Sequence, residues 1–380
     1  MSIYYLLLAV VLINGIFFGK KRKWYVFSTF FLIILVAALR STDIAIDLAG
    51  HYARDYEVIA KSGWNAFPQL VTLTGYDPGF IVFCKLIGYI SADPQCFVAI
   101  TSIFIYFSVA VYIYKYSDDV VLETFLFITS FMYFMYMNII AQAIAAAILM
   151  WAMKFLIDKK YVYYFILAII AVSIHGSAWL ILLYIPLEFL KPKRYNIVAF
   201  IAIVIMATLG YNKIISILIN TVFKQFSFYF TNGNIHGLGQ AMDLYTFCHL
   251  MIYVLAICLA FIFIYYHKEV QLEPARIIKG RGRRILEIPQ ISSNFLVYMT
   301  ICAIVFRVMA TKIYVVSRMG YYTYFFGLTL IVRSLNKTHG KQRIILKMFV
   351  YVIFLLFFLK NGMSAGKLSY GVVPYKFWWK

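Results

Sequence analysis

A carboxylate and an imidazole lie four residues apart in a polar segment of this chain, at Asp47 and His51. On a helix this spacing places both side chains on one face. A carboxylate beside an imidazole orients the ring, and the pair can then remove a proton from a hydroxyl group. Another histidine, His175, is expected in a turn recessed below the membrane surface, where a buried imidazole requires a partner. These three residues are the candidate catalytic groups.

Two arginines at the ends of apolar segments are candidate phosphate ligands. Arg40 follows a long apolar segment, and Arg318 precedes another. A guanidinium at the membrane boundary offers a planar fork of donors that suits phosphate oxygens. The alternative is a side chain that only extends to the interface. A further arginine, Arg307, lies within an apolar segment and is expected to face the interior of the helix bundle.

Amide and aromatic side chains are candidates for binding hydroxyl-rich ligands such as sugars. Asn138 and Gln142 are four residues apart at the end of a segment built otherwise from Ile and Ala. Their amides can hydrogen-bond sugar hydroxyls, although amides in membrane bundles also join neighbouring helices. Tyr375 lies in an aromatic tail, which either anchors the chain at the interface or forms a platform against a sugar face.

The elements that carry these residues are expected to be membrane-spanning helices. The chain has 380 residues, of which 64% are hydrophobic, and its mean hydropathy is +0.84. Apolar segments of about 14–21 residues repeat along its length. This composition excludes a soluble protein and indicates an all-α polytopic membrane protein.

Clusters of Lys and Arg assign the two sides of the membrane, because such clusters remain in the cytoplasm. The expected cytoplasmic loops are 20–23, 267–291 and 333–343, with one more basic cluster at 191–194. Placing all four inside predicts twelve transmembrane helices and both termini outside. The expected spans are 2–18, 24–39, 97–114, 119–136, 139–157, 161–174, 177–190, 195–210, 246–266, 292–310, 319–332 and 344–360.

The remaining segments complete this topology. Loops 40–78 and 211–245 are expected to be periplasmic, and residues 1–380 to form a single integral membrane domain. Segment 79–92 is short and begins after a Pro-Gly turn, so we expect a re-entrant or interfacial segment. Segment 213–231 is expected to be an amphipathic helix along the outer interface.

Net charge and cysteine content exclude other classes. The formal net charge of +20 is explained by the inner loops, which also meet anionic lipid. No loop is long enough for a basic nucleic-acid-binding domain. The five cysteines lie in or beside apolar spans without metal-ligand spacing, so we expect buried thiols. Because the Walker A, GxSxG and HExxH motifs are also missing, phosphate handling is expected to depend on arginine.

The order of the polar segments resembles the EpsG branch of bacterial polysaccharide polymerases. The matching segments are Arg40 with Asp47, Tyr76-Asp77-Pro78-Gly79-Phe80, Asn138-Ile139-Ile140 with Gln142-Ala143-Ile144-Ala145, Ala171-Val172-Ser173-Ile174-His175-Gly176-Ser177, Arg318 with Tyr322, Tyr324 and Phe325, and Pro374-Tyr375. The EpsG branch is similar to the Wzy polymerases of O-antigen (lipopolysaccharide), capsule and exopolysaccharide pathways. The resemblance extends over nearly the whole chain.

The resemblance implies a glycosyltransferase of the bacterial inner membrane that works at the periplasmic face. It would join oligosaccharide repeat units carried on polyprenyl pyrophosphate such as undecaprenyl pyrophosphate, which serve as both donor and acceptor. Arg40 and Arg318 would bind the pyrophosphate. No metal, nucleotide sugar or other cofactor is expected. Membrane lipids are expected partners, a chain-length regulator is a candidate partner, and nucleic acid is not expected to bind.

For such an enzyme, our hypothesis gives roles to individual polar residues. Asp77, Asn138 and Gln142 would orient sugars. Tyr375 would close the cavity, while Asp47, His51 or His175 would deprotonate the acceptor hydroxyl.

The chain departs from the family pattern at two positions. An arginine usually precedes the glutamine that matches Gln142, but this chain has Ala141. Either Arg40 and Arg318 supply the missing positive charge, or the chain is a weakened variant at its pyrophosphate site. The glycine that usually precedes Asp47 in the pattern is replaced by Ala45, which is a milder change.

Three other functions fit parts of the sequence. A flippase or other transporter of lipid-linked oligosaccharides would have polar groups along a path through the middle of the membrane. Here the middle of each span is mostly apolar, and polar groups gather at one side. A ligase that moves finished glycan to a lipid or protein acceptor would use the same site but form a single capped product, and an acyltransferase would modify the glycan.

Overall fold

A computed structural model of the chain describes residues 1–190, 244–265, 276–279, 285–288, 290–310, 318–363 and 370–379. The chain divides into two compact units, which are described separately. The first contains Met1–Leu182, Val270–Ile291 and Val332–Lys380, and the second contains Leu183–Glu269 and Ser292–Ile331. The expectation of a single integral membrane domain stays a prediction.

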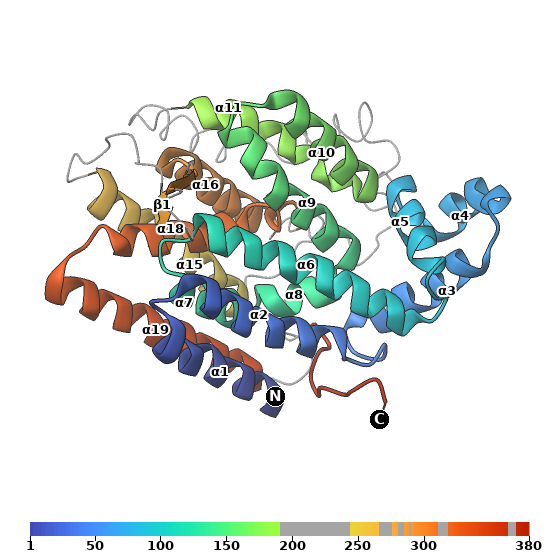
Figure 1. Cartoon of the computed structure of the whole chain (residues 1–380), viewed down its shortest axis with the longest axis horizontal. Helices are drawn as coiled ribbons and strands as arrows, with labels where there is room; N and C mark the ends of the chain where they lie inside the picture. The colour runs from blue at the N-terminus through green and yellow to red at the C-terminus, as the bar shows by residue number, and fades with distance from the viewer. Residues whose placement is uncertain are drawn as a thin grey trace. The chain divides into compact units, whose positions relative to one another are not determined.

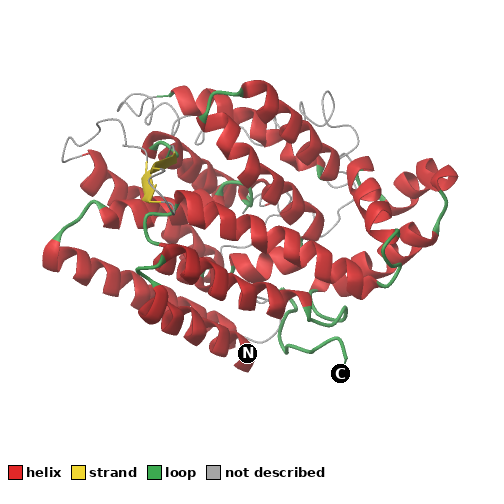
Figure 2. Ribbon diagram, viewed as in Figure 1, coloured by secondary structure: helices red, strands yellow, loops and turns green. Residues whose placement is uncertain are grey.

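Nearly all described regular structure is helical, as expected (Figure 2). The helices of the first unit, apart from the short turns described below, are α1 (Ser2–Phe18), α2 (Arg22–Ala38), α3 (Ala53–Lys61), α4 (Phe67–Thr74), α5 (Pro78–Gly88), α6 (Pro94–Tyr116), α7 (Val120–Thr129), α8 (Met132–Asn138), α9 (Ile140–Ile157), α10 (Tyr161–Ile174) and α19 (Gly340–Met363) (Figure 1). An antiparallel hairpin of β1 (Arg276–Lys279) and β2 (Ile285–Ile288) lies within the expected cytoplasmic loop 267–291.

Helices α7, α8 and α9 contain the core of the first unit, because every residue from 122 to 150 is buried. The segment is not one straight helix. A left-handed Phe131 (φ 67°) separates α7 from α8, which are bent by 56° relative to each other. A second break at Ile139 (ψ 58°) separates α8 from α9.

Helices α2 and α6 run antiparallel, as contacts at both ends show. Arg22 begins α2, and its guanidinium donates to the backbone oxygens of Ile113, Tyr114 and Ser117 at the end of α6. They lie at the C-terminal end of the helix, where the dipole is negative and a cation is favoured. At the other end, Gln95 Nε2 in the first turn of α6 donates to the Ala38 carbonyl (2.9 Å).

Four described helices are long and apolar enough to cross a membrane, or five if the bent pair α7–α8 counts as one span. Apart from 195–210, each expected span falls on a described helix or on consecutive helices. Segments 195–210 and 213–231 lie outside the described residues. Helix α5, within the expected re-entrant segment 79–92, has 11 residues and is about 17 Å long, too short to cross. The total of twelve spans stays a prediction.

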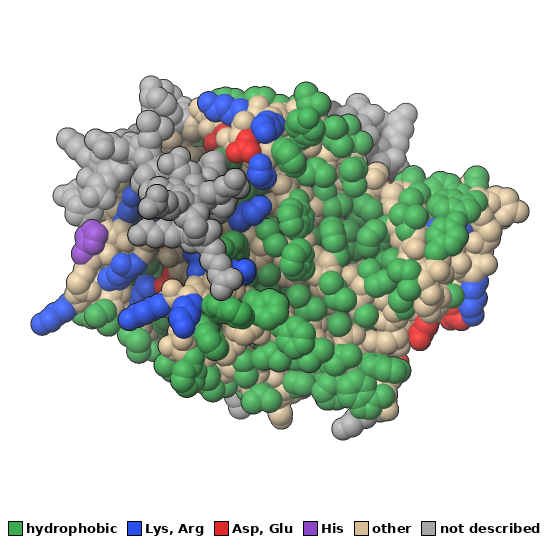
Figure 3. Space-filling view, in the orientation of Figure 1, with side chains coloured by type: hydrophobic (Ala, Val, Ile, Leu, Met, Phe, Trp, Pro, Cys, Tyr) green, Lys and Arg blue, Asp and Glu red, His purple; other side chains and the backbone are tan. Residues whose placement is uncertain are grey.

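Hydrophobic side chains cover most of the visible face of α1, α2, α6 and α10 (Figure 3). Large apolar side chains such as Ile16 in α1 and Phe27 in α2 are exposed. In water such a surface is unfavourable, whereas in a bilayer it meets lipid chains. The surface therefore agrees with a membrane protein.

The second unit contains α11 (Tyr184–Phe189), α15 (Leu244–Ala260), α16 (Ser293–Met309) and most of α18 (Tyr324–Asn336). Tyr184 Oη donates to the Tyr322 carbonyl (2.6 Å). Arg307 is buried and its Nη2 donates to Thr246 Oγ1 (3.3 Å). The prediction that Arg307 faces the bundle interior is confirmed.

Candidate functional site

Four polar segments of the first unit meet through hydrogen bonds between backbone and side chain. The amide N–H of Asp47 donates to Asn138 Oδ1 (2.8 Å), which joins loop 39–47 to the end of α8. The amide N–H of Gly176 donates to Asp77 Oδ2 (2.8 Å), which joins the turn after α10 to the start of α5. The amide N–H of Ala141 lies 3.4 Å from Tyr52 Oη. These contacts bring together residues that are up to about a hundred positions apart in sequence.

An aromatic stack connects these contacts. The rings of Tyr52 and Tyr76 are parallel, with an interplanar angle of 4° and centroids 5.6 Å apart. The His51 ring lies 4.4 Å from Tyr52 and 6.0 Å from Tyr76. Tyr76 Oη donates to Asp55 Oδ2 (3.0 Å), so Tyr76 is held at both ends. Burial raises the pKa of Tyr76, with the neighbouring Tyr52 and Asp55 adding to the effect, and its hydroxyl stays neutral.

The expected pairing of Asp47 with His51 is not present. Residues Leu48–Tyr52 form a π-helical turn instead of an α-helix, and Asn138 holds the backbone of Asp47. A π-turn is wider than an α-turn, so residues four apart no longer lie directly above each other. Among the described residues, no hydrogen bond joins the Asp47 carboxylate to the His51 ring. The catalytic roles of these residues stay predictions.

Asn138 and Gln142 flank the break at Ile139 instead of sharing one continuous helix. Asn138 ends α8, and Gln142 lies in the first turn of α9. Both side chains are buried. Asn138 accepts from Asp47, so its oxygen joins two segments, which is the alternative role that the sequence left open.

His175 lies in the expected turn and is half-buried. It ends α10 in an extended conformation (φ −151°, ψ 112°). Its Nδ1 lies 2.8 Å from Ser177 Oγ and 3.3 Å from the Ser177 amide nitrogen. Gly79 in α5 packs so closely here that a Cβ on it would lie 2.3 Å from Ser173 Oγ. Helix α5 therefore fixes the position of the histidine turn.

Asp77 immediately precedes α5. Its carboxylate accepts a hydrogen bond from the N–H of Gly176, in the turn after α10. Burial raises the pKa of Asp77, and the hydrogen bond from Gly176 partly opposes this rise. A half-buried carboxylate is costly unless it has partners. Its observed partner is the turn that carries His175, so Asp77 positions that turn in this structure.

Arg40 is 1% exposed, which differs from the expected position at an open boundary. Its Nη1 donates to the Ala37 carbonyl and to Ser102 Oγ (2.8 Å). Its Nη2 donates to the Met137 carbonyl (3.2 Å). Both carbonyls lie near helix C-termini, where a cation is favoured. In this structure Arg40 joins α2, α6 and α8, and its role as a phosphate ligand stays a prediction.

The C-terminal segment, residues 370–379, pairs with the loop that follows α2. This pairing covers Arg40. Arg40 and Phe377 form an antiparallel β-bridge. The amide of Ser41 donates to the Lys376 carbonyl (2.9 Å), and the amide of Trp378 donates to the Leu39 carbonyl (3.1 Å). These backbone bonds bind the C-terminal segment along the loop that leads to Asp47.

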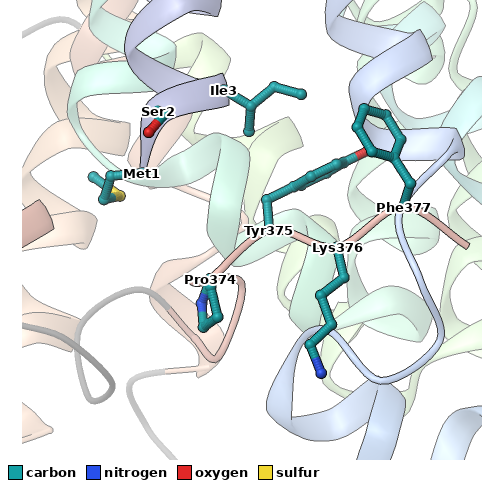
Figure 4. A pocket seen from close by; sticks show the side chains of 7 residues that line it. All are labelled: Met1, Ser2, Ile3, Pro374, Tyr375, Lys376 and Phe377. Carbon is teal, nitrogen blue, oxygen red and sulfur yellow. The ribbon is translucent and has the colours of Figure 1, made fainter. Parts of the chain in front are cut away.

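Tyr375 belongs to this segment, and its side chain packs against α1 and α2. Its ring lies edge-on to Tyr4 (5.7 Å), and its hydroxyl donates to the Val36 carbonyl (2.9 Å). Burial raises the pKa of Tyr375 to about 12, and nearby Arg40 partly opposes this rise. A pocket of about 360 Å³ lies beside it, lined by Met1, Ser2, Ile3, Pro374, Tyr375, Lys376 and Phe377 (Figure 4). Tyr375 thus forms one wall of a pocket, while the proposed closing role is not tested.

The comparison with protein families gives a match over most of the chain. The model of the EpsG family matches residues 23–377. The chain belongs to the EpsG family. No curated protein and no solved structure matches it. EpsG membership suggests a polysaccharide polymerase-type function, and together with the apolar helices it agrees with a membrane protein.

Arg318 is exposed and belongs to the second unit, which is described by itself. In the parts of the chain that the structure describes, no three His, Cys, Asp or Glu side chains lie close enough to hold a metal ion.

Sequence reasoning assigned no role to four residues that the structure holds in or beside the site. Tyr52 and Tyr76 form its stack. Tyr76 belongs to a segment that matches the family pattern, whereas the signal for Tyr52 was the aromatic content of the polar segment around Asp47. Ser177 contacts His175, and its spacing of two residues is a pattern in which a side chain bonds the local backbone. Lys85, in the apolar segment 79–92, is 5% exposed, and its ammonium group donates to the carbonyls of Ile59 and Ser62 at the end of α3.

Proposed function

We propose that this EpsG-family protein is a polysaccharide polymerase of the bacterial inner membrane. It joins oligosaccharide repeat units carried on polyprenyl pyrophosphate, at the periplasmic face. The observation that carries the proposal is that the stacked rings of Tyr52 and Tyr76 connect the Asp47–Asn138 contact with the contact between Asp77 and the turn that carries His175. Family membership supports the same reaction class.

The proposed reaction transfers a glycan from one lipid carrier to another. A hydroxyl oxygen of the acceptor repeat unit forms a bond to the anomeric carbon of the donor glycan. The bond from that carbon to the pyrophosphate oxygen breaks, and the electron pair leaves with polyprenyl pyrophosphate. The hydroxyl proton passes to a base, for which Asp47, His51 and His175 are candidates. The acceptor lipid then carries the lengthened glycan.

Binding requires contacts to hydroxyl groups, sugar faces and pyrophosphate. Asn138 and Gln142 offer amides beside the α8–α9 break, and the His51–Tyr52–Tyr76 stack offers rings. Sugar faces pack favourably on aromatic rings. Arg40 and Arg318 remain the proposed pyrophosphate ligands. Arg40 can fill this role only after a rearrangement, because its two amino groups are bound to Ala37, Ser102 and Met137.

The test is the product made by purified protein in liposomes that contain a lipid-linked repeat unit. A ladder of products separated by one repeat unit supports a polymerase. A single capped product supports a ligase, and movement of the substrate across the bilayer without a new glycosidic bond supports a transporter. Either of these results, or no product from folded protein with the correct repeat unit, contradicts the proposal.

Variants connect the ladder to the site. Asp47→Asn keeps the backbone contact to Asn138 and removes a candidate base, so activity should fall by about 10²-fold or more if Asp47 accepts the proton. His51→Gln tests the other candidate. Arg54→Ala is the matched control, because Arg54 is exposed in the same segment and pairs only with the adjacent Asp55 among its described contacts.

A further inference from the structure

The turn His175-Gly176-Ser177 holds an imidazole in a defined orientation. Helix α10 ends at Ile174, and a 3-10 segment begins at Gly176. The backbone therefore reverses at His175, and both the amide nitrogen (3.3 Å) and Oγ (2.8 Å) of Ser177 contact His175 Nδ1. Two polar groups of one residue thus approach the same ring nitrogen.

These contacts decide which ring nitrogen carries the hydrogen. A backbone N–H can only donate, so Nδ1 must accept with its lone pair. A neutral imidazole has one donor and one acceptor nitrogen, and the hydrogen must then lie on Nε2. An imidazolium would direct a hydrogen from Nδ1 towards the Ser177 N–H. The turn therefore favours the neutral ring with hydrogen on Nε2.

Contacts from α5 hold the turn in place. Asp77 Oδ2 accepts the Gly176 N–H at 2.8 Å. A Cβ on Gly79 would meet Ser173 Oγ, so α5 packs directly against the end of α10. The ring orientation is thus fixed by the fold and not by the imidazole alone.

We propose that Ser177 is a positioning residue that fixes the Nε2–H form of His175, so that His175 acts as a hydrogen-bond donor to an oxyanion. This inference rests on the proposed polymerase reaction. The oxyanion is the pyrophosphate oxygen that gains charge as the glycosidic carbon departs. His175 keeps its hydrogen throughout. The proton of the acceptor hydroxyl goes to Asp47 or His51, so His175 is removed from the candidate bases.

The charged groups around the turn make its titration interpretable. From α5, the carboxylate of Asp77 faces the turn, while Lys85 is bound to carbonyls at the end of α3. From α9, Lys154 and Asp158 pair with each other at the far end of that helix. Lys160 precedes α10 at the opposite end from His175. Among the described residues, Asp77 is therefore the charged group whose own titration must be separated from that of His175.

The experiment combines a structural and a functional readout on the full-length protein. Nitrogen NMR of ¹⁵N-histidine-labelled protein in nanodiscs reports which ring nitrogen carries hydrogen, and His175→Gln identifies the His175 signal among the six histidines. Wild-type protein should show hydrogen on Nε2. Ser177→Ala removes the hydroxyl, so the hydrogen should redistribute between the two nitrogens, while Ser177→Thr should restore the wild-type signal.

Polymerisation is then measured against pH. Without the Ser177 hydroxyl, part of the neutral ring should carry its hydrogen on Nδ1 and lose the donor at Nε2. The activity of Ser177→Ala at neutral pH should therefore fall relative to wild type, by about two-fold if the two neutral forms are equally populated. This deficit should shrink as the pH is lowered, because the charged ring again carries hydrogen on Nε2. Ser177→Thr should match wild type at every pH, whereas a merely structural role would lower activity equally at all pH values. Asp77→Asn, measured in parallel, shows whether the pH dependence belongs to Asp77.

Each outcome separates this inference from the proposed function. Hydrogen on Nδ1 in wild-type protein overturns the inference even if a ladder forms. An unchanged signal together with unchanged relative activity at all pH values in folded Ser177→Ala also overturns it. A wild-type protein with hydrogen on Nε2 but no polymerisation overturns the proposed function and the donor role, while supporting the control of His175 by Ser177.

Discussion

Ala141 stands where the family pattern usually has an arginine, and its surroundings suggest why. The side chain is 3% exposed, and its amide N–H lies against Tyr52 Oη. It is the second residue of α9, where the helix dipole is positive and disfavours a cation. The position in this chain is therefore adapted to a small, neutral side chain.

Ala141→Arg should lower stability and should not lengthen the product ladder. A large side chain forced into a packed interior costs about 1–3 kcal/mol, and the helix terminus adds an unfavourable charge. The measurements are the melting temperature in detergent and the ladder from a lipid-linked repeat unit. Ala141→Met is the control, because it adds bulk without charge. A longer ladder from Ala141→Arg would instead indicate that the chain is weakened at its pyrophosphate site.

Asp77 should make the stability of the folded protein depend on pH, in a direction set by its surroundings. Its pKa is raised from the ordinary value of 3.8 because burial disfavours the carboxylate. A raised pKa in the folded state means that stability is gained as the pH falls through that pKa and lost as the pH rises. The ionised group therefore destabilises the folded protein at neutral pH, although its hydrogen bond to Gly176 limits the cost.

Asp77→Asn should fold at neutral pH at least as stably as wild-type protein, because the amide oxygen can still accept from Gly176. As the pH is lowered from 7 towards 4, the melting temperature of wild-type protein should rise relative to Asp77→Asn. Asp77→Ala should lose about 1 kcal/mol, because Gly176 loses its acceptor. A constant difference between wild type and Asp77→Asn across this range would contradict the raised pKa.

At the scale of elements, apolar segments predicted the helices, whereas the breaks between and within them were only partly predictable. Basic clusters and turn residues marked the ends of α1, α9 and α10. The bend between α7 and α8 depends on a left-handed Phe131, which carries no local signal because bulky residues rarely adopt that conformation. Tertiary packing of a wholly buried segment imposes it. The π-turn at Leu48–Tyr52, which separates Asp47 from His51, was not predicted from the sequence either.

The C-terminal segment was also unpredictable, because its partner lies more than 300 residues away in sequence. Backbone bonds to Leu39 and Ser41 require no particular side chains, so the sequence pattern did not indicate them. Their consequence is large, since they cover Arg40. The sequence identified Arg40 as a candidate site residue. It did not distinguish a buried side chain that connects helices from an accessible side chain that binds phosphate.

Removal of residues 370–380 should uncover Arg40. Trypsin cleaves after Arg and Lys in exposed, extended backbone, and the bond between Arg40 and Ser41 is covered in the intact protein. The truncated protein should be cleaved there under conditions that leave the full-length protein intact at this site. Mass spectrometry of the fragments identifies the cut. The control is Lys376→Ala, which keeps the backbone pairing. Resistance of the folded truncated protein would show that other contacts protect Arg40.

At the scale of the first unit, charges are sorted to the two ends of the helices. Lys347 in α19 pairs with Asp119, which lies between α6 and α7. Lys115 near the end of α6 lies 5.6 Å from the ring centroid of Trp151 in α9. Arg22 binds the end of α6 at this same end. The contacts of Asp47 and Asp77 lie at the opposite helix ends. This arrangement agrees with the alternation of basic and polar loops that the sequence indicated.

The sorted ends predict which side of the membrane each polar loop reaches. Asn65 follows α3 near the gathered residues, Lys160 precedes α10 at the basic end, and both are exposed. In a chain freed of its five native cysteines, an impermeant maleimide should label Asn65→Cys on intact cells. Lys160→Cys should react only after permeabilisation, because basic loops stay in the cytoplasm. The reverse pattern would place Asp47, Asp77 and His175 in the cytoplasm and exclude a periplasmic polymerase. Labelling of both positions on intact cells would show that the chain does not cross the membrane an odd number of times between them.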